Sequence, residues 1–198
     1  MFRVAAIECS SSSRCTPVFS TSRSTRDRVA QLLWRGGSVD IRRDDVEREV
    51  TTIGGITAPG EVRSLAKASH SPRLAIDDES LAWISEFPHL RDLDLRSSDV
   101  TEGGLRKLGE FQSLQFLVLD GALHGMGGLE SFSTPPGLRS LMLDRFRINQ
   151  DDADRFRRFS GLTYLCLNGT KLDDDTFGAM VRMLPNLQHL CLKGTSID

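Results

Sequence analysis

The chain has 198 residues, and its hydrophobic content of 39% is enough to bury the core of about one ordinary domain. Its formal net charge is −2, which argues against nucleic acid and anionic membranes as partners, because both attract proteins with a strong positive field. No apolar run approaches the roughly 18 residues of a membrane-spanning helix. The sequence therefore predicts a soluble, cytoplasmic protein.

Residues 1–24 are rich in serine and arginine and show little apolar periodicity, which is typical of a disordered tail. A mitochondrial transit peptide has a similar composition, and a wrongly assigned start codon would produce the same pattern. The sequence favours the wrong start over the transit peptide and leaves a genuine tail open.

Residues 25–60 change in pattern and are predicted to form a capping segment. The stretch TRDRVAQLLWRGG places Val29, Leu32 and Leu33 on one side and stops at two glycines, which predicts a short amphipathic helix. Apolar residues then alternate on both sides of the polar residues 43–45, which predicts a β-hairpin with one solvated face. These apolar residues are Val39, Ile41, Val46, Val50 and Ile53.

Residues 61–198 repeat an L-x-x-L-x-L pattern five times, at steps of 24, 24, 24 and 25 residues. An incomplete unit precedes the first copy and begins near Val62 and Leu65. The leucines of the five copies are Leu90, Leu93 and Leu95; Leu114, Leu117 and Leu119; Leu138, Leu141 and Leu143; Leu162, Leu165 and Leu167; and Leu187, Leu190 and Leu192.

Each unit reads as a short strand followed by a helix. The L-x-L core has a period of two, so its two leucines point to one side and the residue between them points to the other. An acidic or hydroxylic run such as DDES, TEGG, QDDAD or DDDT follows, which is typical of a capped helix start. One unit cannot bury its leucines alone, so we expect the units to stack into a parallel sheet with helices on its outer side.

These residues resemble a leucine-rich repeat protein, most clearly in LRDLDLRSSDVTEGGLRKL and LTYLCLNGTKLDDDTFGAM. The sub-type is similar to short bacterial repeats of the form L-x-x-L-x-L-x-G-T-x-[IVL]-[TD]-D. Thr170 and Thr195 fit that pattern and Ser98 is close, whereas Ala122 and Phe146 depart from it, so we expect the units between residues 114 and 160 to be irregular. The resemblance implies an α/β solenoid, a short horseshoe with a parallel sheet on its concave face and helices on its convex face, preceded by the helix and hairpin.

The side chains between and beside the inward leucines are expected to line the concave face and to bind a protein partner, as the resemblance also implies. An apolar and aromatic strip with a charged border is typical of such a surface. The alternatives are that these side chains pack on one another across the strands, or that further chain covers them. The candidates are Asp92, Asp94, Arg96, Phe116, Val118, Asp120, Ser140, Met142, Asp144, Tyr164, Cys166, Asn168, His189 and Cys191.

We expect no metal, no other cofactor and no catalysis. Cys166, Cys191 and His189 fall on neighbouring units, but three ligands on a flat sheet make a poor tetrahedron, so we interpret the cysteines as reduced thiols. The acidic runs at residues 77–79 and 173–175 are explained by helix capping. No Ser, Cys or His constellation has the spacing of a nucleophilic site.

The last repeat is predicted to be incomplete, because its strand and Ile197 are not followed by a helix. Either the chain belongs to a longer array, which the sequence favours, or the open edge self-associates with another chain. The predicted function is a non-enzymatic protein-interaction module. The alternatives are a substrate-recognition or regulatory adaptor of an enzyme complex such as a ubiquitin ligase, for which residues 1–60 show no convincing docking motif, and a non-functional fragment.

Overall fold

The computed structural model describes residues 37–43, 46–50, 62–67, 76–96, 98–120 and 128–197, the first three ranges as strands only. The tail predicted for residues 1–24 and the helix predicted to follow it lie outside the described residues. None of the helices in the described part of the chain has both the length and the apolar run needed to span a lipid bilayer.

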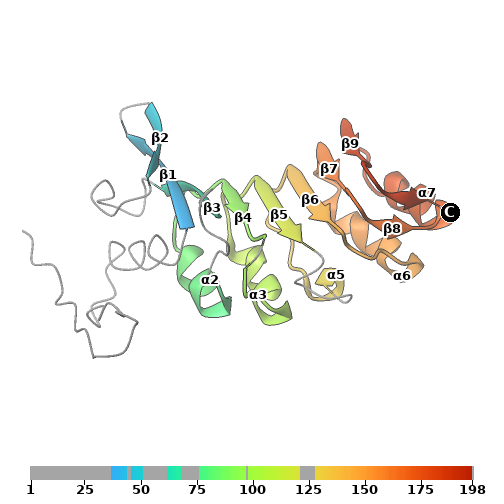
Figure 1. Ribbon diagram of the computed structural model, residues 1–198, viewed down its shortest axis with the longest axis horizontal. Helices are drawn as coiled ribbons and strands as arrows, with labels where there is room; N and C mark the ends of the chain where they lie inside the picture. Colours follow the sequence, from blue (N-terminus) through green and yellow to red (C-terminus); the bar gives the residue numbers. More distant parts are fainter. Residues whose placement is uncertain are drawn as a thin grey trace, which may run out of the picture.

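An α/β fold results, in which a parallel sheet alternates with short helices (Figure 1). The main sheet has eight strands in the order β2-β1-β3-β4-β5-β6-β7-β9. Strands β1 and β2 pair antiparallel on the residues for which the sequence predicted a hairpin, and β1 also pairs antiparallel with β3. The neighbours from β3 to β9 pair in parallel. The strands are β1 (Gly37–Arg43), β2 (Val46–Val50), β3 (Val62–Lys67), β4 (Asp92–Asp94), β5 (Phe116–Asp120), β6 (Ser140–Asp144), β7 (Tyr164–Cys166) and β9 (His189–Cys191).

Short helices follow the strands and lie on one side of the sheet (Figure 1). Their starts confirm the predicted caps, because Asp77, Thr101, Asn149 and Asp173 each accept a hydrogen bond from a backbone N–H of the first turn. They are α2 (Asp78–Ile84), α3 (Glu102–Lys107), η3 (Leu108–Glu110), α5 (Gly128–Ser131), α6 (Gln150–Ala153), η4 (Asp154–Phe159) and α7 (Asp174–Arg182).

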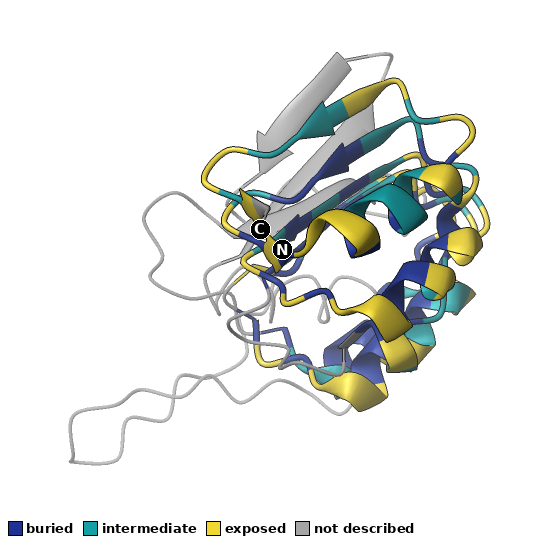
Figure 2. Ribbon diagram, turned by 90° about the vertical axis from the view of Figure 1, so that its right-hand side faces the viewer, coloured by how far each residue is buried: buried dark blue, intermediate teal, exposed yellow. Residues whose placement is uncertain are grey.

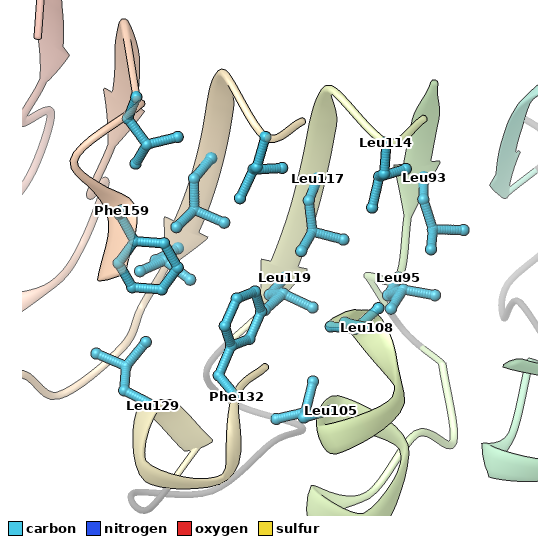
Figure 3. Packing of buried hydrophobic residues seen from close by; sticks show 14 of the residues in the cluster. Leu93, Leu95, Leu105, Leu108, Leu114, Leu117, Leu119, Leu129, Phe132 and Phe159 are labelled. Atoms are coloured by element: carbon cyan, nitrogen blue, oxygen red, sulfur yellow. The ribbon is translucent and has the colours of Figure 1, made fainter. Parts of the chain in front are cut away.

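The leucine pattern forms the core between the sheet and the helices. The middle leucines of the first four copies are 0% exposed and face each other across adjacent strands, as the period of two predicted. Figure 3 shows strand and helix side chains pointing toward one another between the two layers: Leu93, Leu95, Leu117, Leu119, Leu105, Leu108 and Phe132. Each leucine row is therefore buried by the neighbouring units as well as by its own helix.

The turn after each strand joins one unit to the unit before it. The hydroxyl of Thr170 donates to the Leu143 carbonyl over 3.2 Å, and that of Thr195 donates to the Leu167 carbonyl over 2.6 Å. Gly169 and Gly194 precede these threonines with φ of 65° and 68°, the left-handed region that favours glycine. The turns continue into β8 (Lys171–Leu172) and β10 (Ser196–Ile197), which pair in parallel.

The units from 114 to 160 are more regular in their strands than the sequence predicted. Strands β5 and β6 pair over five residues without a shift in register, and Phe146, at the position of Thr170, is buried. Arg145 keeps the left-handed turn, with φ of 61°, although it is not glycine. The irregularity lies in the helical halves, since α5 and α6 have 4 residues each and α6 runs on into the 3-10 helix η4.

Replacing Thr170 with valine keeps the shape of the side chain and removes the donor to the Leu143 carbonyl at a fully buried position. We expect the free energy of unfolding to fall by about 1–3 kcal/mol, measured by urea denaturation. Thr195→Val is the matched control, and its loss should be smaller because Thr195 is partly exposed to water. A Thr170→Val variant as stable as the wild type would contradict this role.

Candidate functional site: the open face of the sheet

The face of the sheet opposite the helices is covered by no described helix, and we call it the open face (Figure 2). Strand alternation places the predicted site residues on it in rows that follow the register of the sheet. One row is Asp92, Phe116, Ser140, Tyr164 and His189, and the next is Asp94, Val118, Met142, Cys166 and Cys191. Asp120 and Asp144 pair at the ends of their strands, next to the turns that carry Arg96 and Asn168.

Solvent exposure divides these residues into a buried group and an accessible group. Val118, Cys166 and Asp120 are only 2%, 1% and 4% exposed, so they offer a partner almost no area. Whether these three residues take part in partner binding stays a prediction, in which they would act by supporting their neighbours rather than by direct contact area. Phe116, Ser140, Met142, Tyr164 and the remaining candidates are partly or fully exposed and form the accessible surface.

Two ion pairs border the open face. Arg96 donates hydrogen bonds to both carboxylate oxygens of Asp94, and Arg145 donates to both oxygens of Asp120 in the preceding unit. The hydrogen bond to Asp94 raises the pKa of Arg96, which keeps the guanidinium charged. The sequence reasoning missed Arg145. Its position in the repeat was the signal that could have indicated a special role, since the later units have Gly169 and Gly194 at the same position.

Asp144 differs from the other border carboxylates. It is partly exposed, and its Oδ1 accepts a weak hydrogen bond from the Cys166 thiol over 3.7 Å, while no ion pair to it is found within the described part of the chain. Its negative charge acts on Tyr164, and the charge of Arg96 acts on Asp144 without forming an ion pair with it.

Tyr164 and Cys191 form a polar contact across β7 and β9, with 3.1 Å between the phenol oxygen and the sulfur. This hydrogen bond, aided by burial, raises the pKa of Tyr164 to about 12. Burial likewise raises the pKa of Cys166 to about 11. Both groups are therefore protonated at neutral pH, and neither supplies a ready nucleophile.

Three further features of the described residues concern metal and acid–base chemistry. No group of three or more His, Cys, Asp or Glu residues in the described ranges is arranged to hold a metal ion. The hydrogen bond from the Thr176 amide lowers the pKa of Asp173, as its role as a helix cap requires. A hollow of about 300 Å³ lies beside the turns before β6 and β7, and Arg158 is the one ionisable residue in its lining.

We compared the chain with known proteins after its geometry was established. No protein-family model matches it. The search of curated proteins also gave no match. What is established for the chain is thus an α/β fold with a parallel sheet that alternates with short helices.

Tyr164 is the single tyrosine of the chain, so its ionisation can be followed by the ultraviolet absorbance of phenolate. We expect a midpoint near pH 12 in the folded chain and near 10 in urea. Because the folded state disfavours phenolate, the associated stability is fully present below about pH 10 and is lost as the pH rises toward 12.

The matched variant for this titration is Cys191→Ala, which removes the main cause of the raised pKa. Its midpoint should move back toward the ordinary value of a tyrosine, whereas Cys191→Ser, which keeps a hydrogen-bonding group, should move it less. An unperturbed midpoint in the wild-type chain would show that the contact with Cys191 is not formed.

Arg145→Gly and Arg145→Ala both remove the ion pair with Asp120, but only alanine keeps a side chain in the left-handed region. We expect the alanine variant to be about 1 kcal/mol less stable than the glycine variant in urea denaturation. Equal stability of the two variants would mean that the backbone at position 145 carries no such cost.

Proposed function

We propose that the repeating strand–helix units form a leucine-rich repeat solenoid and that its open face binds a protein partner without catalysing a reaction. The in-register pairing of the middle leucines from β4 to β9, with a helix on the same side after each of β4, β5, β6 and β7, supports the solenoid. Such an array presents one continuous sheet surface, because each added unit extends both the core and the open face.

The observation that carries the proposal is the group Phe116, Met142 and Tyr164. These large side chains come from the adjacent strands β5, β6 and β7 and are partly exposed on a face that no described helix covers. Aromatic and methionine side chains are enriched where proteins contact each other and are rarely gathered on a surface without a partner. Val118 and Cys166, which are buried on the same face, are the register partners of Met142 on the two neighbouring strands.

The chemistry of the border suits recognition better than catalysis. Arg96 and Arg145 are each neutralised by a carboxylate, while Tyr164 and Cys166 hold their protons. The open face thus offers apolar contact, hydrogen bonds and the negative charge of Asp144. A partner with an apolar segment and a cationic side chain fits this combination.

A quantitative affinity pull-down from a lysate of the source cell tests the proposal. The bait is the wild-type chain or a Phe116→Glu, Tyr164→Glu variant, which places two charges on the apolar group. We expect a partner that the wild type retains and that the variant recovers at least tenfold less, because an uncompensated buried charge opposes association.

The matched control is an Ala82→Glu, Gln112→Glu variant, which adds two glutamates at exposed positions away from the open face. Circular dichroism must show that all three baits are folded. The control should bind as the wild type does. Identical protein profiles for the wild type and the Phe116→Glu, Tyr164→Glu variant would rule out the open face as the binding surface.

A further inference from the structure

Two cysteines lie opposite each other on the open face. Strands β7 and β9 are neighbours in the sheet, and their register pairs Cys166 with Cys191 (Figure 1). Both are free thiols, of which Cys166 is buried and Cys191 is partly exposed. The residues before them, Leu165 and Leu190, belong to the leucine row that points toward the helices. Because successive side chains of a strand point to opposite sides, the two thiols leave the sheet on the same side and next to each other.

The spacing of the two strands suits a disulfide bond. Neighbouring strands of a sheet lie about 4.7–4.9 Å apart, and the Cα atoms of bonded cysteines are usually about 4.4–6.8 Å apart. The thiols already interact in the reduced chain, since burial and, to a smaller extent, a side-chain hydrogen bond with Cys191 raise the pKa of Cys166 to about 11. Bond formation therefore needs only a small movement of either strand.

Polar neighbours hold each of the two sulfur atoms. The phenol oxygen of Tyr164 lies 3.1 Å from the Cys191 sulfur, and the Cys166 thiol donates to Asp144 Oδ1 over 3.7 Å. These contacts run across the three neighbouring strands β6, β7 and β9. Each sulfur has its own partner, which restrains the thiol pair within the face.

Packing does not require cysteine at these two positions. The same row of the sheet carries Asp94, Val118 and Met142 in the preceding units. An acidic, a β-branched and a long apolar side chain are thus all accommodated in this row. Cysteine packs as a small apolar residue and differs from these three in its reactivity toward oxidants.

We propose that Cys166 and Cys191 are an oxidation site, at which a hydroperoxide converts the two thiols into a reversible disulfide bond between β7 and β9. The Cys191 sulfur attacks the terminal peroxide oxygen, the O–O bond breaks, and the departing oxygen takes the thiol proton, which leaves a sulfenic acid on Cys191 and an alcohol. The Cys166 sulfur then attacks the Cys191 sulfur, the S–O bond breaks, and the departing hydroxide takes the Cys166 proton and leaves as water. The two thiols lose two electrons in total, and the hydroperoxide gains them.

The two cysteines differ in ways that assign them to the two steps. An oxidant in solvent reaches Cys191 more easily than Cys166, which is 1% exposed. Met142 is partly exposed in the same row although it has a strand on each side, so access comes from the open side of the face. The raised pKa of Cys166 makes it a poor first nucleophile, but a thiol held beside a sulfenic acid reacts within the molecule.

The inference uses the register of β7 and β9. It does not depend on what adjoins the outer edge of β9 or on the proposed role of the open face.

The test uses the full chain with Cys9→Ser and Cys15→Ser, so that Cys166 and Cys191 are the two remaining thiols. Circular dichroism checks that the chain is folded. Hydrogen peroxide is added, and intact mass spectrometry follows the chain before and after alkylation with iodoacetamide. We expect the treated chain to lose the mass of two hydrogen atoms and to take up no alkyl group. Reduction with dithiothreitol should restore the uptake of two.

The matched control moves one thiol farther away along the same row. In the Cys191→Ala, Val118→Cys variant of that chain, β6 lies between the new thiol and Cys166. Two strand spacings exceed the Cα distance that a disulfide bridges. We expect this variant to form the intramolecular bond at least tenfold more slowly. A Cys166→Ala variant should instead accumulate a sulfenic acid on Cys191, which dimedone traps.

Three results would overturn the proposal. The first is a folded chain in which both thiols are still alkylated after the peroxide treatment. The second is a set of products that contains only sulfinic and sulfonic acids or disulfide-linked dimers. The third is an equal rate of bond formation by the Cys166 and Cys191 pair and by the Cys191→Ala, Val118→Cys variant, since closure would then not depend on the register of the strands.

Discussion

The packing of one leucine row against the next is the interaction on which the rest of the structure depends. A strand of three to five residues with one short helix cannot enclose its own leucines, so Leu117 reaches 0% exposure only because units stand on both sides of it. The hydroxyl bonds of Thr170 and Thr195 tie the turns together over the same interface. Stability is thus a property of adjacent units rather than of single ones.

The packing of the leucines also determines which side chains lie on the open face. Because the leucines must point to the helices, each residue between them must point the other way, whatever its type. The face collects Phe116, Met142 and Tyr164 from the adjacent strands β5, β6 and β7. A packed core lies beneath the face, so the binding that we propose would need little rearrangement of the backbone.

Sequence reasoning located the strands, their parallel order and the helix caps, because all three follow from a repeat that occurs five times. It did not distinguish the buried Val118 and Cys166 from the accessible Met142. The burial of a side chain on a sheet depends on the size of the side chains on the neighbouring strands, which the pattern of one strand does not give. Sequence reasoning also missed Arg145, whose importance appears only when its left-handed φ and its reach to Asp120 are known. The sequence also did not predict that η4 is a 3-10 helix, in which Phe156 and Phe159 pack on each other.

The ladder of unit-to-unit bonds also bears on how the chain folds. The hydroxyl of Thr170 donates to the Leu143 carbonyl, 27 residues earlier in the sequence. The amide of Lys193 donates to the Asn168 side chain, 25 residues earlier. Parallel sheets usually join distant parts of a chain and fold slowly for that reason. Here each strand of the leucine pattern closes a loop of 24 or 25 residues onto its predecessor, so the entropy of closure is similar at every step. A completed unit can act as the template for the next one.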